Sequence, residues 1–268
     1  MEQLHGIKAG AVLPPANEGR ICMKPTIQIA ATINELYLKA ARIFSDQIIA
    51  AVNKAGFCSI VLSGGKTPQP LYALLADETC FSRQIPWDKL FFFWGDERCV
   101  LPSHPNSNFK MVYETLLAKI PVRPEQIFRI EAEQSDPAAA AKSYQTKLEN
   151  FFRLPAGKCP VFDFVILGMG SDGHTASLFP AAKSTYDKED CVAAFWVDKL
   201  QAYRISLLPN ALNNAKFILF LVAGSEKAET LREVLKGNYQ PHHLPAQLIR
   251  PTNGELLWLA DQAAASLL

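Results

Sequence analysis

The sequence lacks the features that mark several protein classes. None of its apolar runs approaches the roughly 20 residues that a membrane-spanning helix requires. Neither sign of charge prevails, because 27 Lys and Arg residues oppose 26 Asp and Glu residues in a chain of 268 residues. Pairs with the CxxC or HxxxH spacing of metal sites are also absent. We therefore expect a soluble globular protein with no membrane, nucleic-acid or metal partner.

Cysteines and the N-terminal residues bear on location and domain organisation. Six cysteines are few for a disulfide-stapled secreted fold, so we expect six free thiols in a reducing compartment and a cytoplasmic location. Residues 1–24 contain Pro14, Pro15 and several charges, with neither the apolar core of a secretory signal nor a transit pattern. We predict a disordered extension over residues 1–24 and a single α/β domain over residues 25–268.

Apolar, strand-like runs alternate with amphipathic segments along the chain. Residues 33–54 carry apolar side chains at helical spacing, after a capping box formed by Thr32 and Glu35. Further helices are expected at 70–76, 108–120, 137–152 and 225–236, and strands at 57–62, 90–94, 161–167, 192–197, 204–208, 217–222 and 256–259. Several strands are apolar throughout, which indicates cover on both faces. We expect an α/β fold: a doubly wound, mainly parallel, Rossmann-like sheet with helices on both faces.

Ligands bind such sheets at the carboxyl ends of the strands, where three polar loops follow apolar runs here. The first, SGGKTP at residues 63–68, combines glycines with a helix start whose free N–H groups suit a phosphate. A nucleotide P-loop is excluded because Ile60 stands where its first glycine is required. A plain tight turn is the alternative interpretation of this loop.

The second loop, GDER at residues 95–98, places three charges at a strand end. Arg98 suits a phosphate or a carboxylate, and Asp96 suits a base or a group that orients one. A solvated loop with internal ion pairs is the alternative.

The third loop, GMGSDGHTA, fits the GxGxxG pattern, which alone is a weak dinucleotide signal. We place His174 at a helix start, where a partly neutral imidazole flanked by Asp172 can act as a base. Farther along, Arg204 opens a strand and Lys227 lies in the first turn of a helix, where a cation opposes the helix dipole and indicates a nearby anion.

Together these loops resemble the 6-phosphogluconolactonase family, within the wider superfamily that includes glucosamine-6-phosphate deaminase. The resemblance covers residues 27–262 and is carried, in order, by LSGGKTP, FFWGDER, HPNSN, DFVILGMGSDGHTASLFP, YRISLLPNALNNA, the Gly224–Lys227 turn, LPAQLIRP and LWLADQAA. It implies hydrolysis of 6-phospho-D-glucono-1,5-lactone to 6-phospho-D-gluconate in the oxidative pentose phosphate pathway. No organic cofactor and no metal are implied, and we expect a monomer or a small homo-oligomer.

The resemblance also assigns roles to individual residues. His174 matches the catalytic histidine, with Asp172 and Asp96 as the two candidates for orienting it. Substrate binding is expected from Ser63, Gly64, Gly65, Thr67, Arg98, Ser107, Asn108, Gly168, Gly170, Gly173, Arg204 and Lys227. Backbone N–H groups of the glycine loop, or Arg98, are the candidate donors to an oxyanion. Lys66 stands where similar proteins usually have serine, so its role is open.

Three rival functions are weaker. A glucosamine-6-phosphate deaminase carries a glutamate shortly after the motif histidine, whereas here no acid occurs between His174 and Asp187. A non-catalytic sugar-phosphate sensor needs a DNA-binding segment, and residues 1–26 are too short and too weakly basic for one. A nicotinamide-dependent oxidoreductase is supported by the glycine pattern alone.

Overall fold

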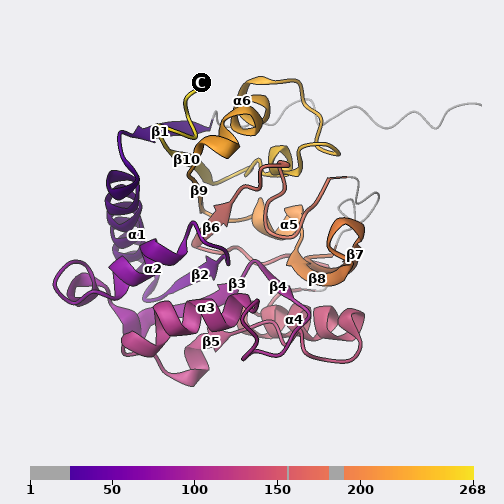
Figure 1. The fold of residues 1–268 in the computed structure, drawn as a ribbon. Coiled ribbons are helices and arrows are strands. Elements are labelled where there is room, and N and C mark those ends of the chain that lie inside the picture. Colours follow the sequence, from indigo (N-terminus) through magenta and orange to yellow (C-terminus); the bar gives the residue numbers. More distant parts are fainter. Residues whose placement is uncertain (1–24, 156, 181–189) are drawn as a thin grey trace, which may run out of the picture.

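The computed structural model describes residues 25–155, 157–180 and 190–268, so the prediction for residues 1–24 lies outside the described residues. In this part of the chain, seven strands form a fully parallel central sheet (Figure 1). Across the sheet they are β1 (Thr26–Ala30), β10 (Glu255–Asp261), β9 (Phe217–Val222), β6 (Phe164–Gly168), β2 (Cys58–Leu62), β3 (Leu90–Trp94) and β5 (Ile127–Phe128).

Helices flank the sheet, and the predicted α/β fold is confirmed (Figure 1). They are α1 (Ile33–Ala55), α2 (Gln69–Ala76), α3 (Asn108–Thr115), α4 (Pro137–Phe152), α5 (Pro209–Leu212) and α6 (Ala228–Lys236). Helix α1 packs against β1, β10 and β2, while α2 lies between α1 and α3. Strands β2 and β9 are buried at every residue, as expected for apolar strands covered on both faces.

Local signals set several helix boundaries as predicted. The Thr32 hydroxyl accepts a hydrogen bond from the Glu35 N–H at 3.1 Å, and Gly56 ends α1 in the left-handed region at φ 80°. Helix α3 is shorter than predicted. It ends at Thr115, because Leu116 leaves the helical region at φ −127° and a short 3₁₀ turn follows.

A second, antiparallel sheet corrects the prediction that the GDER segment is a loop. It consists of β4 (Asp96–Arg98), β8 (Ala202–Leu207) and β7 (Val192–Val197), in that order. Three charged residues in a row carry no strand pattern of their own. Pairing with β8, which lies far away in the sequence, makes them a strand. Helix α4 packs against β7 and β8.

Cysteine pairing is a further correction. Cys159 and Cys191 form a disulfide across 32 residues of sequence, so the prediction of six free thiols is wrong for these two. Spacing in the sequence does not reveal the pair, because folding brings the segment before β6 next to the residue before β7. Cys58, Cys80 and Cys99 are free thiols, and Cys22 lies outside the described residues. Among the described residues, no helix is long and apolar enough to cross a membrane.

The strand order places a crevice near the middle of the sheet. From β2 the chain adds β3 and β5 toward one edge, whereas from β6 it adds β9 and β10 toward the other. The order therefore reverses between β2 and β6. Open α/β sheets bind ligands outside the carboxyl ends of the strands at such a switch point.

Candidate active site

A cavity of about 200 Å³ lies at this switch point. It is bordered by the segments that follow β2, β3, β6 and β9, which are neighbours in the sheet. The lining residues are Ser63, Gly64, Gly65, Lys66, Thr67, Pro68, Asp96, Arg98, Asn108, Gly168, Met169, Gly170, His174, Ala176 and Lys227. The cavity thus brings together the three loops singled out in the sequence.

The loop after β6 does not begin a helix, contrary to the prediction for His174. Instead it folds back on itself, because the Gly170 N–H donates to the His174 carbonyl at 2.8 Å and Thr175 bridges to Leu178. The Thr175 hydroxyl also donates to the Gly168 carbonyl at 2.8 Å. This closed turn holds the imidazole over the glycines.

His174 and Asp172 form a directly bonded dyad. His174 Nδ1 lies 2.5 Å from Asp172 Oδ1, and the imidazole stacks on Phe179 with 4.3 Å between ring centroids. The hydrogen bond with His174 is the largest cause that lowers the pKa of Asp172 from its ordinary value, against the effect of burial. Asp172 is therefore an anion, and Nε2 is the ring nitrogen left for proton transfer.

Asp96 has a different role from Asp172, since its bonds run to other residues. Its Oδ2 accepts from the Ser177 hydroxyl at 2.6 Å, and its Oδ1 accepts from the Asn108 side-chain amide at 3.1 Å. Asp96 is buried and lines the cavity. Of the two candidate orienting carboxylates, Asp172 is the one bonded to His174. Ser177 was missed because a serine in a polar loop carries no distinguishing signal.

Buried Glu97 organises the segment between β4 and α3. Its carboxylate accepts from the backbone N–H groups of Arg98, Asn108 and Phe109 and from the Ser107 hydroxyl. Burial raises the pKa of Glu97, while these backbone donors lower it. Ser107 does not line the cavity. It caps α3 and binds Glu97, which places Asn108 at the cavity wall.

The cavity is rich in unpaired cations. Within the described ranges, Lys66, Arg98 and Lys227 line it and none of them forms an ion pair with a carboxylate. Two buried side-chain oxygens in its wall, Ser63 Oγ and Asn108 Oδ1, have no hydrogen-bond partner. Buried polar atoms without a partner are costly unless a ligand completes them, and cations without a carboxylate partner leave positive charge available to an anion. An anionic, hydroxyl-bearing ligand meets both needs.

Besides Ser107, two predicted binding residues, Gly173 and Arg204, lie outside the cavity lining. Arg204 pairs with Arg98 across β8 and β4, and burial, followed by the charge of Arg98, lowers the pKa of Arg204. Gly173 packs beside Leu244, where an added Cβ would lie 2.7 Å from that side chain.

Two backbone donors of the glycine loop are occupied. The Gly170 N–H binds the His174 carbonyl, and the Gly173 N–H binds the Gly170 carbonyl at 3.1 Å. The alternative that this loop binds an oxyanion is therefore narrowed to its other N–H groups. Arg98, the other alternative, lines the cavity and donates through Nη1 to the Asn106 carbonyl.

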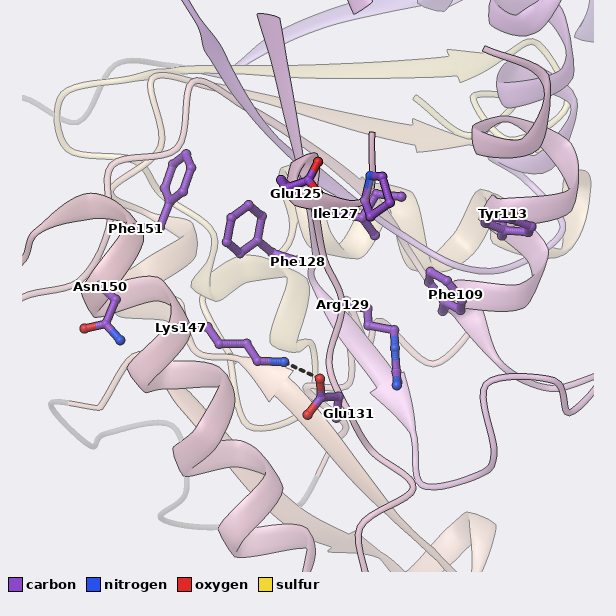
Figure 2. Close-up of a pocket in the computed structure, with 11 residues that line it drawn as sticks. Phe109, Tyr113, Glu125, Ile127, Phe128, Arg129, Glu131, Lys147, Asn150 and Phe151 are labelled. Atoms are coloured by element: carbon purple, nitrogen blue, oxygen red, sulfur yellow. Dashed lines mark hydrogen bonds and ion pairs between the residues drawn. The ribbon is translucent and has the colours of Figure 1, made fainter. Parts of the chain in front are cut away.

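A wider cavity of about 800 Å³ lies at the β5 edge of the sheet (Figure 2). Figure 2 shows aromatic side chains along it, among them Phe128 and Phe151. Both cations in its lining are paired: Lys147 lies 2.6 Å from Glu131, and Arg129 binds Glu133. It shares no lining residue with the His174 cavity and contains no histidine.

Among the described residues, no group of three or more His, Cys, Asp and Glu side chains is placed to hold a metal ion. The polar groups around His174 are its partner Asp172 and the cations of the cavity, rather than a cluster of metal ligands. The chemistry that this arrangement supports is proton transfer by His174 Nε2 beside a bound anion.

Substituting alanine for Gly170 should displace the His174 imidazole. A Cβ built there would lie 2.1 Å from His174 Nδ1 and 2.6 Å from Asp172 Oδ1. We expect kcat to fall by about 10–100-fold, because small misplacements of a reacting group are that costly. Gly95→Ala is the matched control, since its Cβ would meet only ordinary contacts from 3.5 Å. Equal kcat values for the two variants, measured on folded protein, would contradict this reading of the turn.

Comparisons with known proteins agree on one family. The family model described as glucosamine-6-phosphate isomerases/6-phosphogluconolactonase matches residues 31–258. A 6-phosphogluconolactonase of Nostoc sp. is 35% identical over 244 residues, 91% of this chain and 98% of that protein. The 6-phosphogluconolactonase structure from Trypanosoma brucei superposes with a TM-score of 0.79 at 31% identity, covering 91% of this chain and 99% of that one. A monomeric glucosamine-6-phosphate deaminase superposes with a TM-score of 0.73 at 22% identity, covering 91% and 100% of the two chains, which shows a shared fold alone.

Proposed function

The chain belongs to the family of glucosamine-6-phosphate isomerases and 6-phosphogluconolactonases, and we propose that it hydrolyses 6-phospho-D-glucono-1,5-lactone to 6-phospho-D-gluconate. The observation that carries this function is the set of unpaired cations, Lys66, Arg98 and Lys227, in the cavity that holds His174. A phosphate group supplies the missing negative charge. Anchoring the phosphate there brings the lactone carbonyl to the base and lowers the entropic part of the barrier.

In the proposed mechanism, the first step is attack by water. Nε2 of neutral His174 takes a proton from water while the water oxygen forms a bond to the lactone carbonyl carbon, C1. Asp172 stabilises the resulting imidazolium through Nδ1. Negative charge develops on the carbonyl oxygen, and Arg98 is the donor that stabilises it.

In the second step the lactone ring opens. The bond between C1 and the ring oxygen breaks, and the imidazolium of His174 returns its proton to that oxygen. The new carboxylic acid then ionises to give the product. Lys66 and Lys227 hold the phosphate throughout, and Ser63 and Asn108 complete their bonding with sugar hydroxyls.

We further propose that the enzyme acts in the oxidative pentose phosphate pathway, in the cytoplasm where phosphorylated sugars are metabolised. We propose a single α/β domain over residues 25–268, a monomer or small homo-oligomer, and no nucleic-acid partner. The deaminase alternative keeps the same phosphate site, so substrate assays have to separate the two reactions.

The direct test is the rate of lactone decay. Generating 6-phosphogluconolactone in place with glucose-6-phosphate dehydrogenase and following it by NMR should reveal a rate well above the spontaneous one. Unphosphorylated glucono-1,5-lactone is the matched substrate, and its kcat/KM should be lower by about 10–100-fold, since it lacks hydrogen bonds to charged groups. No acceleration with the phosphorylated lactone would overturn the proposal. Ammonia release from glucosamine 6-phosphate would then support the deaminase.

A further inference from the structure

The turn between β7 and β8 reaches the catalytic loop from the second sheet. Lys199 lies in this turn, and its Nζ is 2.7 Å from Asp172 Oδ2. The turn is held closed by Gln201, whose backbone and side-chain N–H groups both donate to the Asp198 carbonyl. The lysine is thus presented to the dyad by a defined turn.

Lys199 and His174 share one carboxylate. Asp172 gives Oδ1 to His174 Nδ1 at 2.5 Å and Oδ2 to Lys199 Nζ at 2.7 Å. The Lys199 side chain is 69% exposed, and an ion pair this exposed contributes little to folding stability. The ion pair matters more for the dyad than for stability. Because His174 and Lys199 each bind one oxygen of Asp172, the carboxylate is held in one rotation. Lys199 also places a positive charge behind the imidazole.

We propose that Lys199 is a positioning residue for the reaction. It orients the Asp172 carboxylate toward His174 by binding its second oxygen, and it places a positive charge behind the dyad. This role rests on the proposed function of His174 as the base, and Lys199 itself touches neither substrate nor water in the mechanism.

The charge around His174 comes from several packed elements. From the surrounding loops and turns, the charged groups in the His174 cavity and behind the dyad are Lys66, Asp96, Arg98, Asp172, Asp198, Lys199 and Lys227. Among the cations of the described residues, only Lys199 is ion-paired with the carboxylate that binds His174. Removing its charge favours the imidazolium, so protonation of His174 shifts to higher pH and the neutral base is lost earlier as the pH falls.

The test compares Lys199→Met with two further variants. Lys199→Arg keeps the charge and should restore wild-type behaviour. Lys147→Met makes the same chemical change in an ion pair with Glu131 (Figure 2), in a cavity that shares no residue with the site. The readouts are the titration of the His174 imidazole, followed by NMR without substrate, and the pH profiles of kcat and KM.

We expect Lys199→Met to raise the titration midpoint of His174 by about 0.5 pH unit, the effect of one screened charge. The acidic limb of kcat should move the same way, and kcat above that limb should fall about 2–5-fold with KM unchanged. A titration midpoint equal in Lys199→Met and wild type would overturn the inference. Because this titration needs no turnover, it decides the role of Lys199 even if the wild-type protein proves inactive on the lactone.

Discussion

Replacing His174 by alanine should lower kcat for lactone hydrolysis by about 10²–10⁴-fold, the usual contribution of a general base. The remaining rate comes from phosphate binding and Arg98, which the substitution leaves in place. KM should change little, because the cations that hold the phosphate belong to other segments. The measurement is lactone decay by NMR, corrected for the spontaneous reaction.

The control for this experiment is His242→Ala, which removes an exposed imidazole outside the cavity. It should leave kcat unchanged. The hydrogen bond with His174 keeps the pKa of Asp172 below its ordinary value, so Asp172 keeps its charge near neutral pH. A His174→Ala enzyme with the wild-type kcat would remove the base from the mechanism.

Replacing Asp172 by asparagine should also lower kcat by about 10²–10⁴-fold. The amide nearly preserves the shape of the side chain but loses the charge that stabilises the imidazolium. It also permits a tautomer with the proton on the wrong ring nitrogen. The fold should survive, because the Asp172 side chain is 23% exposed and the substitution nearly keeps its size. Steady-state kinetics measure the loss of kcat, and a thermal melt measures any loss of folding stability.

The variant Asp96→Asn decides which of the two carboxylates orients His174. Asp96 binds Ser177 and Asn108 rather than His174, so this variant should lose at most about tenfold in kcat, the value of a single weakened hydrogen bond. If Asp96→Asn were the more damaged of the two variants, the orienting carboxylate would have to be reassigned to Asp96.

Local sequence signals predicted much of the fold. Helix α1 begins beside Thr32 and ends at Gly56, because capping and left-handed backbone depend on residues within one turn. Strands β3, β7 and β9 begin and end where their apolar runs do. Strands β1 and β5 were missed. They lie at the two edges of the sheet, where partial exposure weakens the apolar pattern.

The sequence by itself determined which loops form the site. A parallel sheet brings the carboxyl ends of its strands to one edge, so the loops after β2, β3 and β6 had to meet there. His174, the glycines and the cation Arg98 could be singled out because their residue types carry the chemistry wherever the loops fold.

Only the tertiary structure decided the contacts between distant segments. It bonded Asp96 to Ser177, brought Lys199 to the Asp172 carboxylate, and joined Cys159 to Cys191. It also turned GDER into a strand by pairing it with β8. Each of these outcomes depends on which side chains and backbones meet across the fold, and residues far apart in the chain give no local signal of that meeting.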